Sequence, residues 1–384
     1  MKVKPKTTIL VIGYLPPPYE GTAKLTQVII NSKLLNDTFN IVFLSLKKNS
    51  QTQERGALNL TNLINNFLNY INFIKLLIFK KPKLVYMALA QNKFGFIRDS
   101  VFILISGLFK TKVCLHFLGG SFNEFYNASN NFLKKYIKYV LNKADKIILL
   151  ANKIKEGFTG IVSDQKFTTV YNCAPDDVVK SQVNKTNGQF NILFLGYLSK
   201  AKGALDLVKA AEIVLKQTSN IYFHLCGQGV DIEKNIKFIS EPNFGYSKIK
   251  EILENPIIAK NVTIRNQIID DEKEKLFHLA NVFVLPSYSE GMPMAVLEAM
   301  QHSLPLITTT AGAMGEVLIE NENTFFVSTN NPAAIADKII YLYNNSSEAE
   351  RIGANNKKLT TEKYNSTVFT QDLSKIWAKL TKQP

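Results

Sequence analysis

Two glutamates eight positions apart, Glu290 and Glu298, have the residue type and the spacing to hold a polar ligand. The residues before them, 281–286, read as a short buried strand that is closed by a proline. Pro293 then stands near the first position of a helix over 294–301. We therefore expect Glu290 in the loop at the carboxyl end of a strand. Glu298 should lie more than one turn into the helix and face the same crevice.

The start of this helix would supply a second kind of binding group. Backbone N–H groups in the first turn of a helix have no partners within it, and they form a ready site for an anionic phosphate. Carboxylates for hydroxyl groups and a helix end for a diphosphate together suit a nucleotide sugar. Taken alone, however, the two glutamates favour a simpler interpretation, in which Glu290 caps the helix and Glu298 is a solvated surface residue.

The neighbouring residues reverse that preference. The segment 287–300, SYSEGMPMAVLEAM, follows the letters LP and resembles the E-x7-E motif of retaining GT-B glycosyltransferases of the group 1 (GT4-like) family. The resemblance implies that Glu290 contacts the donor sugar and that Glu298 holds the ribose. It also implies that the backbone of the turn between them approaches the sugar and the phosphate, at Gly291, Met292, Pro293 and Met294.

A glycine-bearing loop with two lysines, 196–203, joins the first strand of the second half to its helix. Such a loop at the carboxyl end of a strand can cradle a phosphate. It resembles the G-R-L-x-x-x-K-G segment of the same family, which implies that Gly196 and Lys202 lie at the donor diphosphate. Tyr197 stands where the family has arginine, so phosphate binding would depend on Lys202, Lys200 or backbone N–H groups. The simpler interpretation is a solvated loop lysine.

The first half contains looser resemblances. The segment 16–25, PPPYEGTAKL, resembles the P-P-x-x-G-G loop beneath the donor phosphates, with Gly21 as its first glycine and Thr22 in place of the second. In the strand and loop 112–126, Leu118 occupies the position of the family's sugar-contacting histidine. His116 would share a strand face with it and is our candidate for that catalytic role. The alternative is a buried strand histidine with a hydrogen-bonded ring.

The resemblance further implies that the backbone around Asn266 and Gln267 meets the nucleobase. Asp270 and Asp271 follow closely, and we expect them to cap the next helix and not to bind a metal. The sequence has no D-x-D cluster that stands out. The expectation is therefore a donor site without a metal ion or another cofactor.

The elements that must position these residues form two similar halves. Strand-like and helix-like segments alternate in both, which predicts an α/β protein with parallel sheets and helices on both faces. The resemblance implies the GT-B fold, two Rossmann-like domains facing a central cleft. We expect an acceptor-side domain over 1–180, a nucleotide-sugar domain over 190–366, and a terminal helix over 367–384 that crosses back to the first domain.

Composition limits the class of protein. The chain has 384 residues, 46% of them apolar and 20% charged, which fits a globular protein and not a disordered one. Residues 1–180 hold 25 Lys and Arg against 10 Asp and Glu, so they carry the whole net charge of +15. This excess would attract an anionic membrane or a lipid diphosphate, or it would only keep the protein in solution.

The cysteines and the N-terminus indicate the compartment. Three cysteines lie far apart without a CxxC pair, which is typical of a reducing compartment. We find no secretory signal and no membrane span, and we expect a cytoplasmic protein, with peripheral attachment to the inner face of the plasma membrane as a further candidate.

Our leading interpretation is a retaining glycosyltransferase. It would move a sugar from a nucleoside diphosphate sugar, with UDP or GDP as the base-bearing part, to a glycan or lipid-linked acceptor in bacterial cell-surface polysaccharide biosynthesis. Two alternatives stay open. One is a nucleotide-sugar epimerase, or a phosphorylase, on the same fold. The other is a noncatalytic glycan- or nucleic-acid-binding protein, although nucleic acid is not among the partners we expect.

Overall fold

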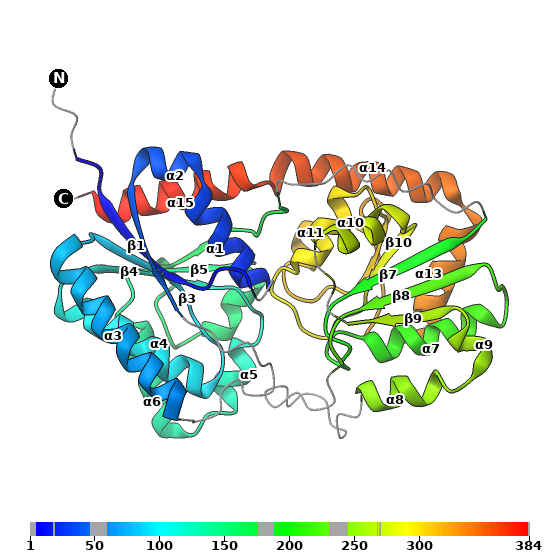
Figure 1. The fold of residues 1–384 in the computed structure, drawn as a ribbon, viewed down its shortest axis with the longest axis horizontal. Coiled ribbons are helices and arrows are strands. Elements are labelled where there is room, and N and C mark those ends of the chain that lie inside the picture. Colours follow the sequence, from blue (N-terminus) through cyan, green and yellow to red (C-terminus); the bar gives the residue numbers. More distant parts are fainter. Residues whose placement is uncertain are drawn as a thin grey trace. The chain divides into compact units, whose positions relative to one another are not determined.

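The chain folds into two units. The structure, a computed structural model, describes residues 5–17, 20–46, 60–175, 188–229, 245–266, 268 and 270–382. The first unit comprises residues 1–172 together with 366–384, and the second comprises 173–365. Each contains its own six-stranded parallel sheet with helices on both faces (Figure 1). The α/β fold with two Rossmann-like domains is therefore confirmed.

The sheet of the first unit has the strand order β2-β1-β3-β4-β5-β6. All of its strand pairs are parallel. Its strands are mostly apolar and buried because helices cover both faces. They are β1 (Thr8–Gly13), β2 (Asn40–Ser45), β3 (Leu84–Ala88), β4 (Lys112–Phe117), β5 (Lys146–Leu149) and β6 (Phe167–Thr169).

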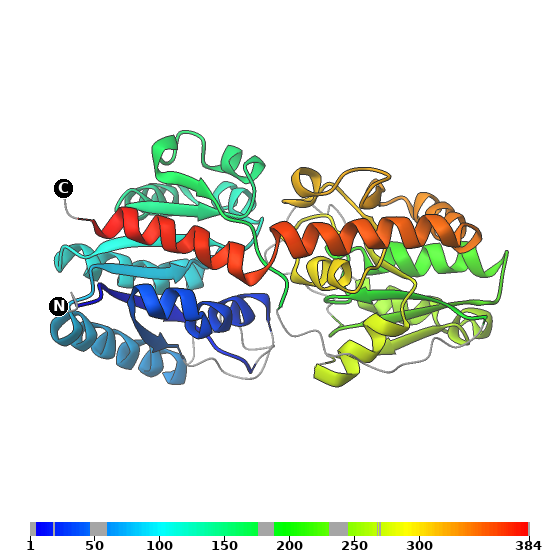
Figure 2. The ribbon, with the colours of Figure 1, turned by 90° about the horizontal axis from the view of Figure 1, so that it is seen from above.

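Two helical layers enclose this sheet. One face carries α1 (Gly21–Asn31), α2 (Lys33–Thr38) and α15 (Ser366–Thr381), and the other carries α3 (Leu60–Lys80), α4 (Lys93–Leu108) and α6 (Asn131–Leu141) (Figure 2). The shorter elements are α5 (Phe122–Asn127), η2 (Lys153–Phe158) and η3 (Asp164–Lys166). In the described residues no helix combines the length and the apolar character that crossing a bilayer requires.

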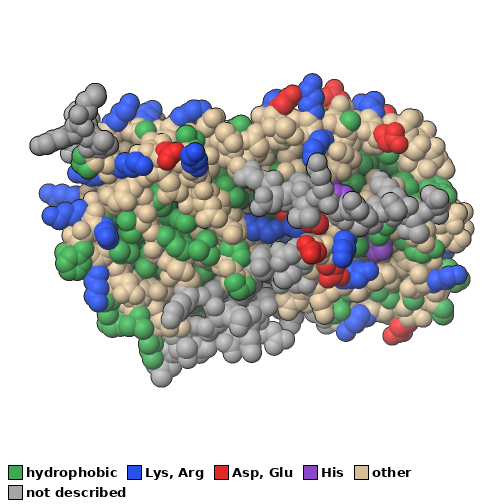
Figure 3. All heavy atoms as spheres, turned by 45° about the horizontal axis from the view of Figure 1, so that its top comes forward, with side chains coloured by type: hydrophobic (Ala, Val, Ile, Leu, Met, Phe, Trp, Pro, Cys, Tyr) green, Lys and Arg blue, Asp and Glu red, His purple; other side chains and the backbone are tan. Residues whose placement is uncertain are grey.

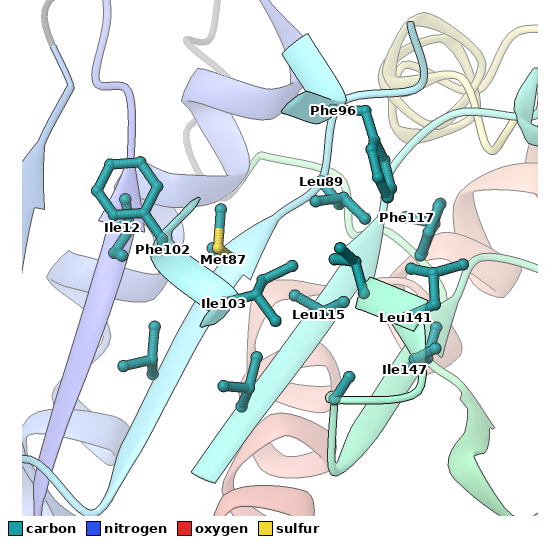
Figure 4. Packing of buried hydrophobic residues seen from close by; sticks show 14 of the residues in the cluster. Ile12, Met87, Leu89, Phe96, Phe102, Ile103, Leu115, Phe117, Leu141 and Ile147 are labelled. Atoms are coloured by element: carbon teal, nitrogen blue, oxygen red, sulfur yellow. The ribbon is translucent and has the colours of Figure 1, made fainter. Parts of the chain in front are cut away.

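The core on the α4 side is built from strand and helix residues that interlock. Met87 and Leu115 of neighbouring strands face Phe102 and Ile103 of α4 (Figure 4). On the opposite side, Trp377 of α15 is fully buried. Burial of a tryptophan contributes several kcal/mol, about 3–5 by the cost of its removal. The last helix is therefore an integral part of the first unit.

The sheet of the second unit has the order β12-β11-β10-β7-β8-β9. Its strands are β7 (Phe190–Leu195), β8 (Ile221–Cys226), β9 (Val262–Arg265), β10 (Val282–Leu285), β11 (Leu306–Thr308) and β12 (Thr324–Phe326). One helical layer contains α7 (Ala204–Leu215), α8 (Gly245–Ile252), α9 (Pro256–Ala259) and α13 (Pro332–Asn344). The other contains α10 (Asp270–Leu279), α11 (Met294–Gln301) and α14 (Ser346–Lys363), and α12 (Met314–Val317) follows β11.

This strand order has a switch point between β7 and β10. From β7 the chain adds β8 and β9 on one side, and it then returns to add β10, β11 and β12 on the other. In open α/β sheets, ligands bind outside the carboxyl ends of the strands at such a point, because the two loops there diverge and leave a crevice. The loops that follow β7 and β10 are therefore the first place to look for a site.

Candidate active site

Lys202 and Glu290 come from the two loops that leave the switch point. The strands before them are direct parallel neighbours, with Val282 beside Ile192 and Phe283 beside Leu193. Lys202 follows β7, and Glu290 follows β10. Residues 88 positions apart in the chain are thus brought together by strand pairing.

The two side chains form an ion pair. Lys202 Nζ lies 2.7 Å from Glu290 Oε1, and the hydroxyl of Ser287 donates to the same oxygen at 2.8 Å. The side chain of Glu290 is 6% exposed and that of Lys202 is 29% exposed. Both bonds use Oε1, so Oε2 of Glu290 makes no hydrogen bond to the described residues. The arrangement offers one carboxylate oxygen to a ligand hydroxyl and one ammonium group to an anion.

Close backbone packing holds the two loops against each other. The amide of Tyr288 donates to the carbonyl of Ala201 at 2.8 Å. Gly203 has a φ of +72°, and a Cβ at this position would collide with the carbonyl of Pro286. Only glycine combines that backbone conformation with that approach. The loop glycine therefore fixes the position of Lys202 relative to Glu290.

Glu298 lies in α11, the helix that follows the loop of Glu290, and it has a different ion-pair partner. The helix α11 runs from Met294 to Gln301 as predicted, with Pro293 at its N-cap. Glu298 Oε1 is 2.8 Å from Nζ of Lys273, which belongs to α10. The side chains are 4% and 11% exposed. Lys273 is a site residue that the sequence analysis missed, because nothing in the local pattern shows which face of α10 packs on α11.

The other predicted donor residues of the second unit have separate surroundings. Gly196, Tyr197 and Lys200 lie between β7 and α7, and Asn266 follows β9 at the edge of the sheet and is exposed. Gln267 lies outside the described residues. The turn before α11 contains Gly291, which is buried, Met292, which is 4% exposed, and the half-buried Pro293 and Met294.

Comparison with known proteins finds a family match in the second unit. The family described as glycosyl transferases group 1 matches residues 176–359. Those residues include Lys202, Glu290 and Glu298. This segment, just under half of the chain, is a match to the group 1 glycosyl transferases. The family expected from the sequence is therefore confirmed, whereas its GT4-like subdivision stays a prediction.

The individual relatives of the chain are distant. An uncharacterized glycosyltransferase of Methanocaldococcus jannaschii is 25% identical over 249 residues, which cover 64% of this chain and 62% of that protein. The capsular polysaccharide biosynthesis glycosyltransferase CapM of Staphylococcus aureus is 26% identical over 197 residues, which cover 51% of this chain and 48% of CapM. The chain thus spans about half to three fifths of the length of these relatives.

A solved structure extends the likeness in fold to both units. The Anabaena protein HepE in complex with UDP-glucose superposes with a TM-score of 0.71 over 97% of this chain and 99% of that one. The two sequences are 14% identical. At this identity the superposition shows a shared fold alone.

Beside Glu298, the glycosyl transferase domain contains a cluster with metal-ligand chemistry. Ligand atoms of Glu274, His278 and His302 lie within 4.8 Å of one another. His302 Nε2 is 2.9 Å from a carboxylate oxygen of Glu274. In both histidines Nδ1 is hydrogen-bonded to a backbone carbonyl oxygen at 2.8 Å. Two imidazole nitrogens and a carboxylate are ligands that Zn²⁺ accepts. The sequence analysis missed the cluster because its members come from different helical segments.

In the first unit, the structure corrects the role given to His116. The side chain is fully buried in β4, where Nδ1 lies 2.7 Å from the hydroxyl of Tyr86. Phe369 of α15 stacks on the ring at 6.5 Å between centroids. A ring enclosed in this way does not reach a ligand, so His116 is a core residue, as the alternative interpretation held. Gly21, the other predicted residue of this unit, is the half-buried first residue of α1.

We expect His116 to make stability depend on pH. Burial lowers the pKa of His116 to about 3, below the unfolded value of about 6.5. Between these two pKa values the unfolded chain binds a proton that the folded chain does not. The free energy of unfolding therefore falls as the pH drops below about 6.5. Between pH 7 and pH 5 the loss should be about 2 kcal/mol. Urea denaturation of wild type and His116→Gln checks this, since the variant should lose about 2 kcal/mol less. Parallel pH profiles would contradict it.

A partly buried ion pair holds the two loops together at the corresponding switch point of the first sheet. Asp99, which is 1% exposed, accepts from the amide of Ala90 at 2.9 Å and lies 2.7 Å from a guanidinium nitrogen of Arg98. Arg98 donates to the hydroxyl of Tyr14 at 2.7 Å. Tyr14 follows β1 and Ala90 follows β3, its neighbour in the sheet. This bracing, which the sequence analysis missed, fixes the two loops relative to each other.

Proposed function

We propose that the protein is a retaining glycosyltransferase that moves a sugar from a UDP- or GDP-sugar to a glycan or lipid-linked acceptor in cell-surface polysaccharide biosynthesis. The observation that carries this proposal is the ion pair of Lys202 with Glu290 at the switch point of the second sheet. The capsular function named for CapM supports the pathway. The UDP-glucose bound to HepE supports the class of donor.

In this proposal, Lys202 offsets the charge that develops on the leaving diphosphate. Its side chain is 29% exposed, so the ammonium group can turn from Glu290 to a phosphate oxygen at small cost. Electrostatic stabilisation of the leaving group is the expected main contribution to catalysis. The lysine supplies the cation itself, so we propose that transfer needs no metal ion.

Glu290 would orient the donor sugar through its hydroxyl groups, and Glu298 would hold the ribose. The acceptor hydroxyl attacks C1 on the face from which the diphosphate departs, and its proton passes to the diphosphate. The bond from C1 to the acceptor oxygen forms as the bond to the diphosphate oxygen breaks, so the configuration at C1 is retained. Glu290 is not required as a nucleophile.

A thermal-shift screen of nucleoside diphosphates tests the donor class. A ligand that binds only the folded state at 100 times its Kd stabilises that state by about 2.7 kcal/mol. We expect UDP or GDP, with the corresponding sugar nucleotides, to raise Tm by about 5 °C or more. NAD is the control and should leave Tm unchanged. A shift with NAD but with no nucleoside diphosphate would reject the proposal.

We further propose that the protein works as a peripheral protein at the inner face of the plasma membrane. The excess of 15 positive charges within residues 1–180 supports this location, because it would attract an anionic membrane surface. A lipid-linked acceptor would be presented at that surface.

A further inference from the structure

The first unit contains a basic groove at the amino edge of its sheet. The groove has a volume of about 600 Å³ and lies where α3, α4 and α15 end and where β3 and β4 begin. Its basic side chains are Lys81, Lys83, Lys110, Lys112 and Lys382. No acidic residue lines it within the described part of the chain. This edge is opposite the carboxyl ends of the strands, where the loops of Tyr14 and Ala90 lie.

The backbone brings these lysines together. A left-handed residue follows α3 and another follows α4, with φ of +45° at Lys81 and +53° at Lys110, and each turns the chain back into a strand. Both turns have the sequence Lys-x-Lys, once just before β3 and once at the start of β4. The two turns are adjacent, since the amide of Lys112 donates to the carbonyl of Lys83 at 3.2 Å.

Most of this charge has no counter-charge. Lys112 pairs with Asp145 at 2.8 Å. Among the described residues, Lys81, Lys83 and Lys110 make no ion pair. The positive charges that line one groove repel one another, and an anion bound in the groove would relieve this repulsion.

Large apolar side chains stand exposed next to the lysines. Phe79 at the end of α3 is 78% exposed, and Leu108 at the end of α4 is 82% exposed. Ile78 and Phe109, which line the groove, are also exposed. In Figure 3, blue Lys and Arg side chains lie beside green hydrophobic ones on the surface of the first unit. Exposed apolar groups beside basic ones indicate an interaction surface.

We propose that this edge of the first unit docks on an anionic phospholipid bilayer. The lysines of the groove bind lipid phosphate groups, while Phe79 and Leu108 enter the headgroup region. A free phosphate or a nucleic acid would use the lysines alone and leave both apolar side chains in water, whereas a bilayer matches both kinds of side chain. The inference rests on the peripheral location proposed above and assigns the surface that produces it.

Vesicle sedimentation tests the surface. The wild type should bind vesicles of phosphatidylcholine with 30% phosphatidylglycerol, because lysines are attracted to an anionic lipid surface. It should not bind vesicles of phosphatidylcholine alone. Lys83→Glu/Lys110→Glu should lower the partition coefficient about tenfold or more. Phe79→Ser/Leu108→Ser, which touches no charge, should also lower it. The matched control is Lys33→Glu/Lys135→Glu, two exposed lysines outside the groove, and it should bind nearly as the wild type does.

The outcomes separate this inference from the proposed activity. If the groove variants bind as the wild type does, or lose no more binding than the control, the surface is wrong. If the wild type binds a short DNA duplex more tightly than the vesicles, the lipid is wrong. The shift in Tm with a nucleoside diphosphate reports the donor site independently, and the groove variants should retain it.

Discussion

Replacing Lys202 by methionine is expected to lower kcat/KM for transfer by about 10²- to 10³-fold. Methionine keeps most of the length of the side chain and removes only the charge that would meet the leaving diphosphate. Losses of this size follow when one group that stabilises developing charge is deleted. Folding should suffer by only about 1 kcal/mol, because the pair with Glu290 is partly exposed and the Ser287 hydroxyl remains. A transfer assay with the matching sugar nucleotide measures the effect.

Calorimetry would distinguish this role from simple neutralisation of Glu290. If Lys202 meets the diphosphate, Lys202→Met should weaken binding of the nucleoside diphosphate at least tenfold and leave binding of the parent nucleoside unchanged. Lys216→Met, an exposed lysine of the same unit, is the control and should bind both ligands as the wild type does. Equal losses for the diphosphate and the nucleoside would show that Lys202 acts only on the structure of the loop.

The site could be predicted from the sequence where local patterns determine it. The apolar run before Pro286 and the proline at residue 293 specify a strand, a turn and a helix, and α11 begins and ends at the predicted residues. Glu290 consequently lies in the predicted loop. Strand alternation likewise predicted two parallel sheets, because strands that are buried on both faces are nearly all apolar.

Contacts between distant segments were not predictable in the same way. Lys273 meets Glu298 only because α10 packs beside α11, and periodicity within one helix does not reveal its neighbour. The period of two along β4 places His116 and Leu118 on one strand face. It does not say that Phe369, more than 250 residues later, covers that face. This packing makes His116 a buried core residue.

Replacing Glu298 by alanine should weaken donor binding and lower stability, for two separate reasons. Under the proposed function, Glu298 holds the ribose equally in the ground state and the transition state, so KM for the donor should rise about 10- to 100-fold with kcat little changed. Stability should also fall, because the change removes the carboxylate that pairs with the largely buried ammonium group of Lys273. Kinetics and urea denaturation measure the two effects.

The double variant Glu298→Ala/Lys273→Met separates these effects. It removes both charges, so it should recover most of the stability. The donor KM should stay high, because the ribose partner is still absent. A 2′-deoxy nucleoside diphosphate gives a second check: the wild type should prefer the ribose form, and both variants should lose that preference. If the double variant regains the wild-type KM and the preference for ribose, Glu298 acts only through its pair with Lys273, and the assignment to the ribose fails.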